Sequence, residues 1–294
     1  MKKVSVKNHI RRIFILLSVL LAANISNIQA QENPIAPTIN DSLQEINDSW
    51  ERFSLSFGGF LSNYNSGISI GSERLGIGIH IDLEDALGLK TAAFAFRGNT
   101  NYRFGKKMKH AVSFGYFGVY RNSHKVLQTE LEIGNIVIPV GSEINSSFDL
   151  SIWRAKYDYS FLQNENVSLG ISVGLFIMPI RFSVKTLHFE EQATDLVAPL
   201  PVIGLRSDFL ITEKLYLRQS VELLLISIDN FQGRILDLDI KVEHQTFEHI
   251  SFGLGVNSNR LNIKAKGDTY PDIDFYGEIG MEYTGIYFFA KYHF

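Results

Sequence analysis

The chain has 294 residues, a formal net charge of −3 and no cysteine, which excludes disulfides and a lipoprotein anchor. Hydrophobic residues make up 45% of the sequence, so a large core can form. Basic residues form no cluster outside the N-terminus, and the acidic balance therefore argues against a nucleic-acid partner.

The first thirty residues have the pattern of a signal peptide. Basic residues up to Arg12 precede an apolar run over 13–23, and we expect cleavage after Ala30. The alternative is a transmembrane anchor, but the run is about half of the roughly 20 residues that a spanning helix needs. Without this segment the chain has 23 basic and 31 acidic residues, a net charge of −8.

Residues 31–51 are polar and contain two prolines, which predicts a periplasmic N-terminal segment with a short helix starting at Asn40 or Asp41. Residues 52–294 show no break in composition and no repeat, so we predict one domain there.

Alternation with a period of two predicts strands in this domain. Residues 92–104 place apolar side chains on one face and Arg97 and Arg103 on the other, and residues 236–243 alternate likewise. A soluble sandwich gives the same pattern. The export signal and the aromatic residues at strand ends favour an all-β fold, a transmembrane up-and-down antiparallel β-barrel.

We predict twelve strands, with ten as the alternative because the first two are weakly patterned. The predicted strands span residues 52–62, 66–72, 75–83, 91–104, 109–122, 146–162, 167–184, 198–212, 215–228, 231–247, 250–263 and 274–294. Short connections are typical of periplasmic turns and longer polar ones of extracellular loops, so both termini should be periplasmic. The short connections are 105–108, 163–166, 212–214 and 246–249. The longer ones are 122–146, 185–197 and 264–272.

The apolar face changes parity inside three strands. This pattern predicts β-bulges at 152–153, 178–179 and 284–285, the last of which could instead be a turn.

The last nine residues alternate between an apolar row and a row with Lys291 and His293, as expected between lipid and a polar lumen. The terminal Phe294 resembles the signal by which the barrel assembly machinery recognises outer-membrane barrels. We therefore expect the protein in the cell outer membrane, with that machinery, lipid and lipopolysaccharide as partners. The sequence indicates no oligomeric state.

Several segments resemble a family of uncharacterised outer-membrane β-barrel proteins of Gram-negative bacteria. These segments are 81–89 (I-D-L-E-D-A-L-G-L), 102–104, 147–150, 157–162 and 198–206. The resemblance covers roughly residues 55 to 294 and implies the barrel and its location, but no catalytic residues.

The inward rows of the predicted barrel carry interleaved charges of both signs. They hold Arg97, Arg103, Arg154, Lys156, Asp158, Arg206, Asp208, Arg218, Glu222, Asp237, Asp239, Lys241, Glu243, Glu278 and Glu282. We interpret them as a salt-bridge network that partly plugs the lumen, in which Arg218 and Glu222 pair with the neighbouring strand. A charge-lined conduit and a catalytic set are the alternatives.

An enzyme of the acyl-hydrolase type would need a nucleophile beside a base. The close sets in the sequence are His124 with Ser123 and His188 with the acidic pair 190–191. We interpret these histidines as exposed loop residues and assign no catalytic residue.

Acidic residues cluster in two segments, which invites a metal hypothesis. The clusters are Asp82, Glu84 and Asp85, and Glu190, Glu191 and Asp195. Neither matches the twelve-residue calcium loop, so we assign no metal and no cofactor.

The sequence thus favours a non-enzymatic structural barrel or a narrow small-solute channel. The alternatives are a lipid-modifying enzyme and a surface-binding protein acting through the loop 122–146, whose run 136–140 is apolar.

Overall fold

The computed structural model describes residues 50–70, 80–133, 136–186, 192–228, 230–269 and 273–294. The described residues form ten long strands and three short ones. The long strands are β1 (Phe53–Ile70), β3 (Ala92–Phe104), β4 (His110–Val126), β7 (Glu143–Gln163), β8 (Val167–Thr186), β9 (Gln192–Thr212), β10 (Leu215–Ile228), β11 (Phe231–Gln245), β12 (Ile250–Thr269) and β13 (Ile273–His293). The short strands are β2 (Ile81–Asp82), β5 (Leu131–Ile133) and β6 (Ile136–Ile138).

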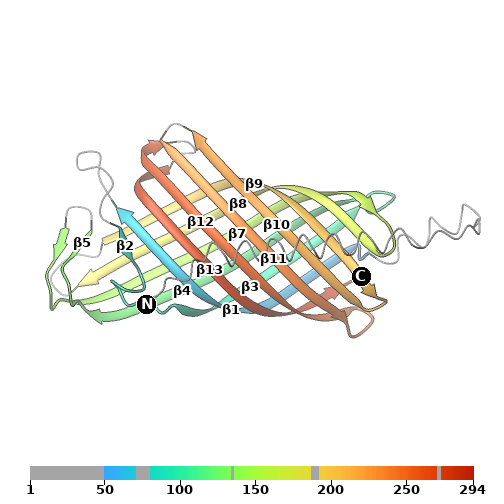
Figure 1. Ribbon diagram of the computed structural model, residues 1–294, viewed down its shortest axis with the longest axis horizontal. Helices are drawn as coiled ribbons and strands as arrows, with labels where there is room; N and C mark the ends of the chain where they lie inside the picture. Colours follow the sequence, from blue (N-terminus) through green and yellow to red (C-terminus); the bar gives the residue numbers. More distant parts are fainter. Residues whose placement is uncertain (1–49, 71–79, 134–135, 187–191, 229, 270–272) are drawn as a thin grey trace, which may run out of the picture. The chain divides into compact units, whose positions relative to one another are not determined.

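The long strands pair antiparallel in chain order, and β13 returns to pair with β1 (Figure 1). This closing ladder joins residues 54–70 to residues 277–293, so the sheet has no free long edge among the described strands. At its end the backbone N–H of Phe53 donates to the carbonyl of Phe294 at 2.9 Å. The predicted all-β antiparallel barrel is therefore confirmed. In the same residues, no helix is long and apolar enough to cross a membrane.

The ring contains ten strands among the described residues, so the preferred count of twelve is wrong and the alternative of ten holds. The predicted strands 52–62 and 66–72 are one continuous strand, β1, because β13 pairs with it along its whole length. Of the predicted strand 75–83, only Ile81 and Asp82 are described as a strand. Residues 71–79 lie outside the described part.

Successive connections between the long strands alternate between the two ends of the barrel. We call the end that carries the connections 105–109, 164–166, 213–214 and 246–249 the turn end, and the opposite end the loop end. Figure 1 shows β2 and β5 at the loop end and the C-terminus at the turn end.

The loop-end strands are longer than the sequence pattern predicted. The predicted loop 264–272 is wrong for 264–269, which continue β12, and β8 and β9 likewise extend into the predicted loop 185–197. Lys264 and Lys266 made this segment look like a loop. They alternate with the buried residues Ile263 and Ala265, and so belong to a strand whose outer face is polar.

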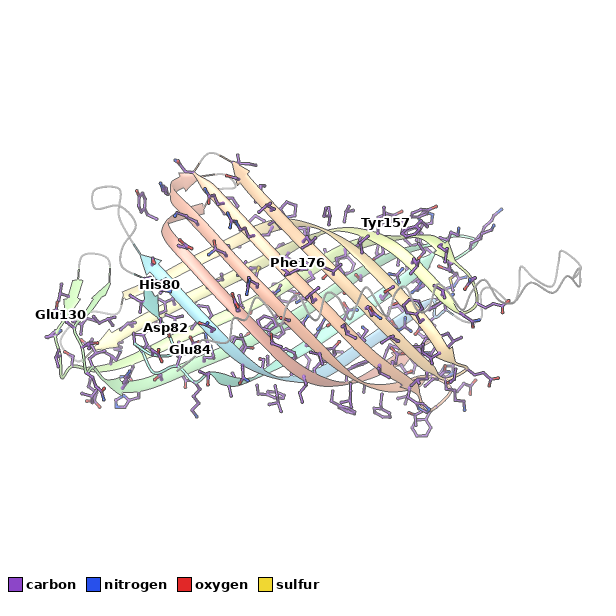
Figure 2. All side chains as sticks on the ribbon, viewed as in Figure 1. His80, Asp82, Glu84, Glu130, Tyr157 and Phe176 are labelled. Atoms are coloured by element: carbon purple, nitrogen blue, oxygen red, sulfur yellow. The ribbon has the colours of Figure 1, made fainter. Side chains whose placement is uncertain are left out.

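The barrel exterior carries a broad apolar surface. Its large exposed apolar side chains include Phe57, Leu61, Phe94, Phe114, Trp153, Ile171, Val173, Ile203, Leu205, Leu223, Leu225, Leu254, Val256, Ile286 and Phe288. Aromatic rings cluster on the turn-end part of the wall, where Figure 2 shows Tyr157, and His110 donates to or accepts from its hydroxyl at 2.6 Å. Such a surface is typical of a wall that faces lipid.

None of the three predicted bulges shifts the register, so these predictions are wrong. The described ladders shift between Ser160 and Leu162 and between Leu215 and Tyr216. Opposite Pro179, β7 loses two ladder pairs and then resumes in the same register. Each strand keeps the same face toward the interior. The apolar row moves to the other face because the inward side chains change from charged to apolar along the strand.

Candidate functional site: the barrel interior

The interior of the barrel has two chemically distinct halves. On β7 the inward even positions are apolar from 148 to 152 and charged from 154 to 158. On β12 the inward odd positions are apolar from 261 to 265 and small or polar from 251 to 259. We call the half near the loop end the apolar half and the half near the turn end the charged half.

The charged half gathers most of the predicted lumen residues. Inside the barrel lie Arg97, Arg103, Arg154, Lys156, Asp158, Arg206, Asp208, Arg218, Glu222, Asp237, Asp239, Lys241 and Glu243. They come from β3, β7, β9, β10 and β11, and all of them except Asp237 line a cavity of about 140 Å³.

Ion pairs cross the lumen in this half. Arg97 of β3 contacts Asp239 of β11 at 2.7 Å, and Arg154 of β7 contacts Asp237 of β11 at 3.1 Å. These strands are not neighbours in the sheet, so the pairs bridge the interior. The amide of Asn257 also donates to Asp237 at 2.7 Å, which helps to offset the cost of burying this carboxylate.

Asp208 is the centre of a second cluster. Arg206 contacts its carboxylate at 2.7 Å, Arg103 at 3.0 Å and Arg218 at 3.7 Å. One carboxylate thus faces three guanidinium groups.

The predicted pairing of Arg218 and Glu222 with charges on the neighbouring strand β11 is wrong for Glu222. Glu222 binds Lys156 of β7, whereas Arg218 contacts Glu243 of β11 at 3.1 Å. Arg218 and Glu222 lie roughly 13 Å apart along their strand and therefore belong to different clusters.

Two residues that precede β1 complete the charged half. Trp50 is fully buried and donates its indole N–H to the carbonyl of Asn164 at 2.8 Å. Glu51 contacts Arg218 at 2.5 Å and also binds Lys291. Burial alone would raise the pKa of the Glu51 carboxyl, but Arg218, Lys291 and Arg103 together hold that pKa well below its ordinary value.

The sequence prediction missed Glu51 and Lys291 as members of this network. Glu51 was placed in the N-terminal segment 31–51, outside every predicted strand. Lys291 stood on the polar row of the last strand, which is the signal that could have identified it. Residues 1–49, which hold the predicted signal peptide and nearly all of the N-terminal segment, lie outside the described residues.

Glu278 and Glu282 were predicted to face the lumen, and this assignment is wrong. Both point outward from β13: Glu282 contacts Arg260 at 2.6 Å and Glu278 contacts Lys264 at 3.7 Å, with these side chains about a third to a half exposed. The prediction assumed that the polar row always faces inward. Here the inward row is apolar, and Met281 is buried.

The apolar half is closed by a turn that inserts from the loop end. Ile81, Leu83, Leu87 and Leu89 are all buried in the same apolar core as the inward residues of the strands. This is the I-D-L-E-D-A-L-G-L segment. Its apolar positions therefore fill the mouth of the barrel.

Local signals explain why this segment forms a compact turn. The Asp82 carboxylate accepts a hydrogen bond from the backbone N–H of Asp85 at 2.8 Å, as a capping residue does. At the other end Gly88 adopts a φ of 72° and donates its N–H to the carbonyl of Glu84 at 3.0 Å. Glycine takes this left-handed conformation without strain, so the turn can end there.

One buried ion pair anchors the turn to the wall. Glu84 accepts from Arg121 of β4 at 2.5 Å and from the backbone N–H of Ser66 of β1 at 2.8 Å. The Arg121 guanidinium lies over the rings of Tyr64 and Phe148 at 4.8 and 5.1 Å. Figure 2 shows Asp82 and Glu84 together near the loop end.

The candidate catalytic and metal residues have other partners. The exposed His124 ring contacts Glu143 at 2.7 Å and Asn145 at 3.0 Å instead of Ser123. His188 and the acidic pair 190–191 lie outside the described residues, and the side chain of Asp195 is not described. Across the part of the chain that is described, no group of three or more His, Cys, Asp or Glu side chains could hold a metal ion.

The apolar run 136–140 belongs partly to the core. Ile138 of β6 is buried with Leu131 of β5 and Leu127, whereas Val137 and Val140 are exposed. Packing therefore accounts for part of this run, and a surface-binding role for the loop 122–146 stays a prediction.

Comparisons with known proteins identify the architecture. No protein-family model and no curated protein matches the sequence. The barrel is similar to the outer membrane protease OmpT from Escherichia coli, with a TM-score of 0.52 and 9% identity over 82% of this chain and 96% of that chain. The chain has the outer-membrane β-barrel fold.

Other outer-membrane barrels show a weaker similarity. The transport unit of the autotransporter AIDA-I from Escherichia coli has a TM-score of 0.39 and 10% identity over 92% of this chain and 97% of that chain. The toluene transporter TodX of P. putida has a TM-score of 0.34 and 7% identity over 85% of this chain and 92% of that chain. At such identities the likeness concerns the fold alone. The resemblance to one particular family of uncharacterised barrels stays a prediction.

Proposed function

We propose that the protein is a structural outer-membrane barrel with a closed lumen. The observation that supports this most is the inserted turn, whose Leu83 and Leu87 are fully buried in one core with Phe148 and Phe176 from the walls. A close-packed apolar interior leaves no room for water. Among the described residues, ions and polar solutes therefore have no wet path through this half.

The size of the ring supports the same proposal. Barrels hold wide water channels at about 16–18 strands, whereas side chains fill small ones. Here large side chains fill the apolar half, and ion pairs bridge the charged half between β11 and both β3 and β7. We therefore prefer the structural barrel to the narrow channel.

The exterior supports a place in the outer membrane. The apolar outer wall suits lipid, and the ten-strand ring brings both ends of the domain to the turn end. With the predicted signal peptide, this end would face the periplasm. Phe294 is exposed there beside the ring of Phe53, whose centroid is 5.1 Å away, where an assembly factor could reach it.

Conductance in planar lipid bilayers tests the closed lumen. We expect no stable unitary conductance from the wild-type barrel. Replacing Leu83 and Leu87 together by Asp should expel the turn from the apolar core and produce openings. The matched control is Asp85→Ala, on the exposed side of the same turn, which should stay silent.

A stable wild-type conductance would contradict the closed lumen. Silence in the double variant, with its turn shown by protease cleavage to be released, would place the seal elsewhere in the barrel.

A further inference from the structure

The cavity in the charged half is lined by more cations than anions. The lining cations are Arg97, Arg103, Arg154, Lys156, Arg206, Arg218, Lys241 and Lys291. The lining anions are Glu51, Asp158, Asp208, Glu222, Asp239 and Glu243. Even with Asp237, which pairs with Arg154, seven carboxylates face eight cationic groups among the described residues.

Two of these cations could form further hydrogen bonds or ion pairs. Arg103 is 1% exposed, and its Nε and Nη1 have no hydrogen-bond partner among the described residues, although its guanidinium lies over the Trp50 ring at 5.3 Å. Its remaining nitrogen contacts Asp208, which Arg206 and Arg218 share. Lys241 forms no ion pair in the described part of the chain, and its ammonium lies 5.6 Å from the centre of the Phe289 ring.

An unpaired cation inside a barrel is costly, and an anion that binds it recovers part of that cost. The guanidinium fork matches the oxygens of carboxylates and phosphates, and the ammonium adds a point charge. Arg103 and Lys241 line the same cavity as Asp208, which Arg103 contacts at 3.0 Å. This region therefore carries local positive charge that Asp208 alone does not neutralise.

We propose that this cavity is a binding site for a small oxyanion, a phosphate or a carboxylate, held by Arg103 and Lys241. The volume of about 140 Å³ fits a few waters or one small oxyanion, since a water occupies roughly 30 Å³ in the liquid. Glu51 lines the cavity beside the buried Trp50, so the ligand would enter past this segment at the turn end. The site goes beyond the closed lumen and uses the opposite half of the interior.

Calorimetric titration of the folded full-length mature barrel with sodium phosphate, at constant ionic strength set by chloride, tests the site. We expect saturable binding to one site. Lys241→Met should weaken it about tenfold or more, because a charge-assisted contact is lost while no described ion pair is broken. The matched control is Lys264→Met, a lysine on the outer wall, which should bind phosphate as the wild type does.

A second variant keeps the test decisive if Lys241→Met fails to fold. Arg103→Lys preserves the charge but removes the fork, and it should weaken phosphate binding while leaving the protein folded. Acetate in place of phosphate shows whether a carboxylate also binds.

Absence of saturable binding of both anions to the wild type would overturn the proposal. So would an equal loss in Lys241→Met and Lys264→Met. A conducting wild-type barrel would contradict the closed lumen without affecting this result.

Discussion

The two halves of the interior are built by the same ten strands and stabilised by different physics. In the apolar half, close packing around Phe148 and Phe176 encloses one ion pair of the described residues, Glu84 with Arg121. In the charged half, more than a dozen ionised groups share partners around a cavity. A charge that loses its partner therefore meets apolar side chains in one half, and other ions and water in the other.

The largest difference should appear when the ion pair of the apolar half is broken. Glu84→Leu leaves Arg121 buried among apolar groups and should lower the free energy of unfolding by about 3–5 kcal/mol. The double variant Glu84→Leu with Arg121→Met should regain most of this loss, because no unpaired charge remains. Chemical unfolding in lipid vesicles measures both. Additive losses would show that the pair is not coupled.

The corresponding change in the charged half should cost less. Glu222→Gln removes the partner of Lys156, but Asp158 lines the same cavity and that cavity can admit water, so we expect a loss of about 1–3 kcal/mol. Adding Lys156→Gln should recover part of it. If Glu222→Gln lowered the free energy of unfolding as much as Glu84→Leu does, the proposed difference between the halves would be contradicted.

The packing of Trp50 and Glu51 against the charged half should respond to acid. The pKa of Glu51 is held below its ordinary value of about 4.3, so its ion pairs stabilise this packing fully at pH values above about 4.3. They weaken as the pH falls through the lowered pKa. In a Trp153→Phe background, Trp50 is the one remaining tryptophan. Its fluorescence should stay constant from pH 7 to about 5 and change only below about pH 4.

Glu51→Gln provides the control for this titration. It should alter the fluorescence of Trp50 at pH 7, because the contacts with Arg218 and Lys291 are weakened. A wild-type transition between pH 6 and 7 would show that another group holds the segment.

The smallest effect should come from the outer wall. Arg260 and Glu282 form an ion pair that is nearly half exposed, so Glu282→Gln should change the free energy of unfolding by about 0–1 kcal/mol, and less in high salt. Spin labels should find position 282 accessible from outside the barrel. A decrease in the free energy of unfolding of 3 kcal/mol or more would indicate that Glu282 belongs to the interior network.

Alternation predicted the barrel well and its interior only in part. It reports the difference between the two faces of a strand. At Arg97 and Asp239 the outer face is apolar toward lipid and the inner face is charged. Toward the loop end the outer face of the wall is polar and the inner face apolar. The pattern therefore wrongly predicted that Glu282 faces the lumen. It also wrongly predicted a bulge at Trp153.

The contacts within the site could not be predicted from the sequence for a different reason. The pair of Lys156 with Glu222 and the pair of Glu84 with Arg121 join segments that are 66 and 37 residues apart. Alternation tells which face a residue occupies, but not which partner lies across the lumen. The capping Asp82 and the turn glycine Gly88 were visible locally, whereas their insertion into the barrel was not.

Cysteine accessibility tests the contrast between the halves most directly, because the chain has no cysteine of its own. Single cysteines would replace Ser220, which lines the cavity, and Met178, which is buried in the apolar half. In the folded barrel a small water-soluble thiol reagent should modify position 220 and spare position 178, and after unfolding it should modify both. Equal modification rates at the two positions of the folded barrel would contradict a sealed apolar half.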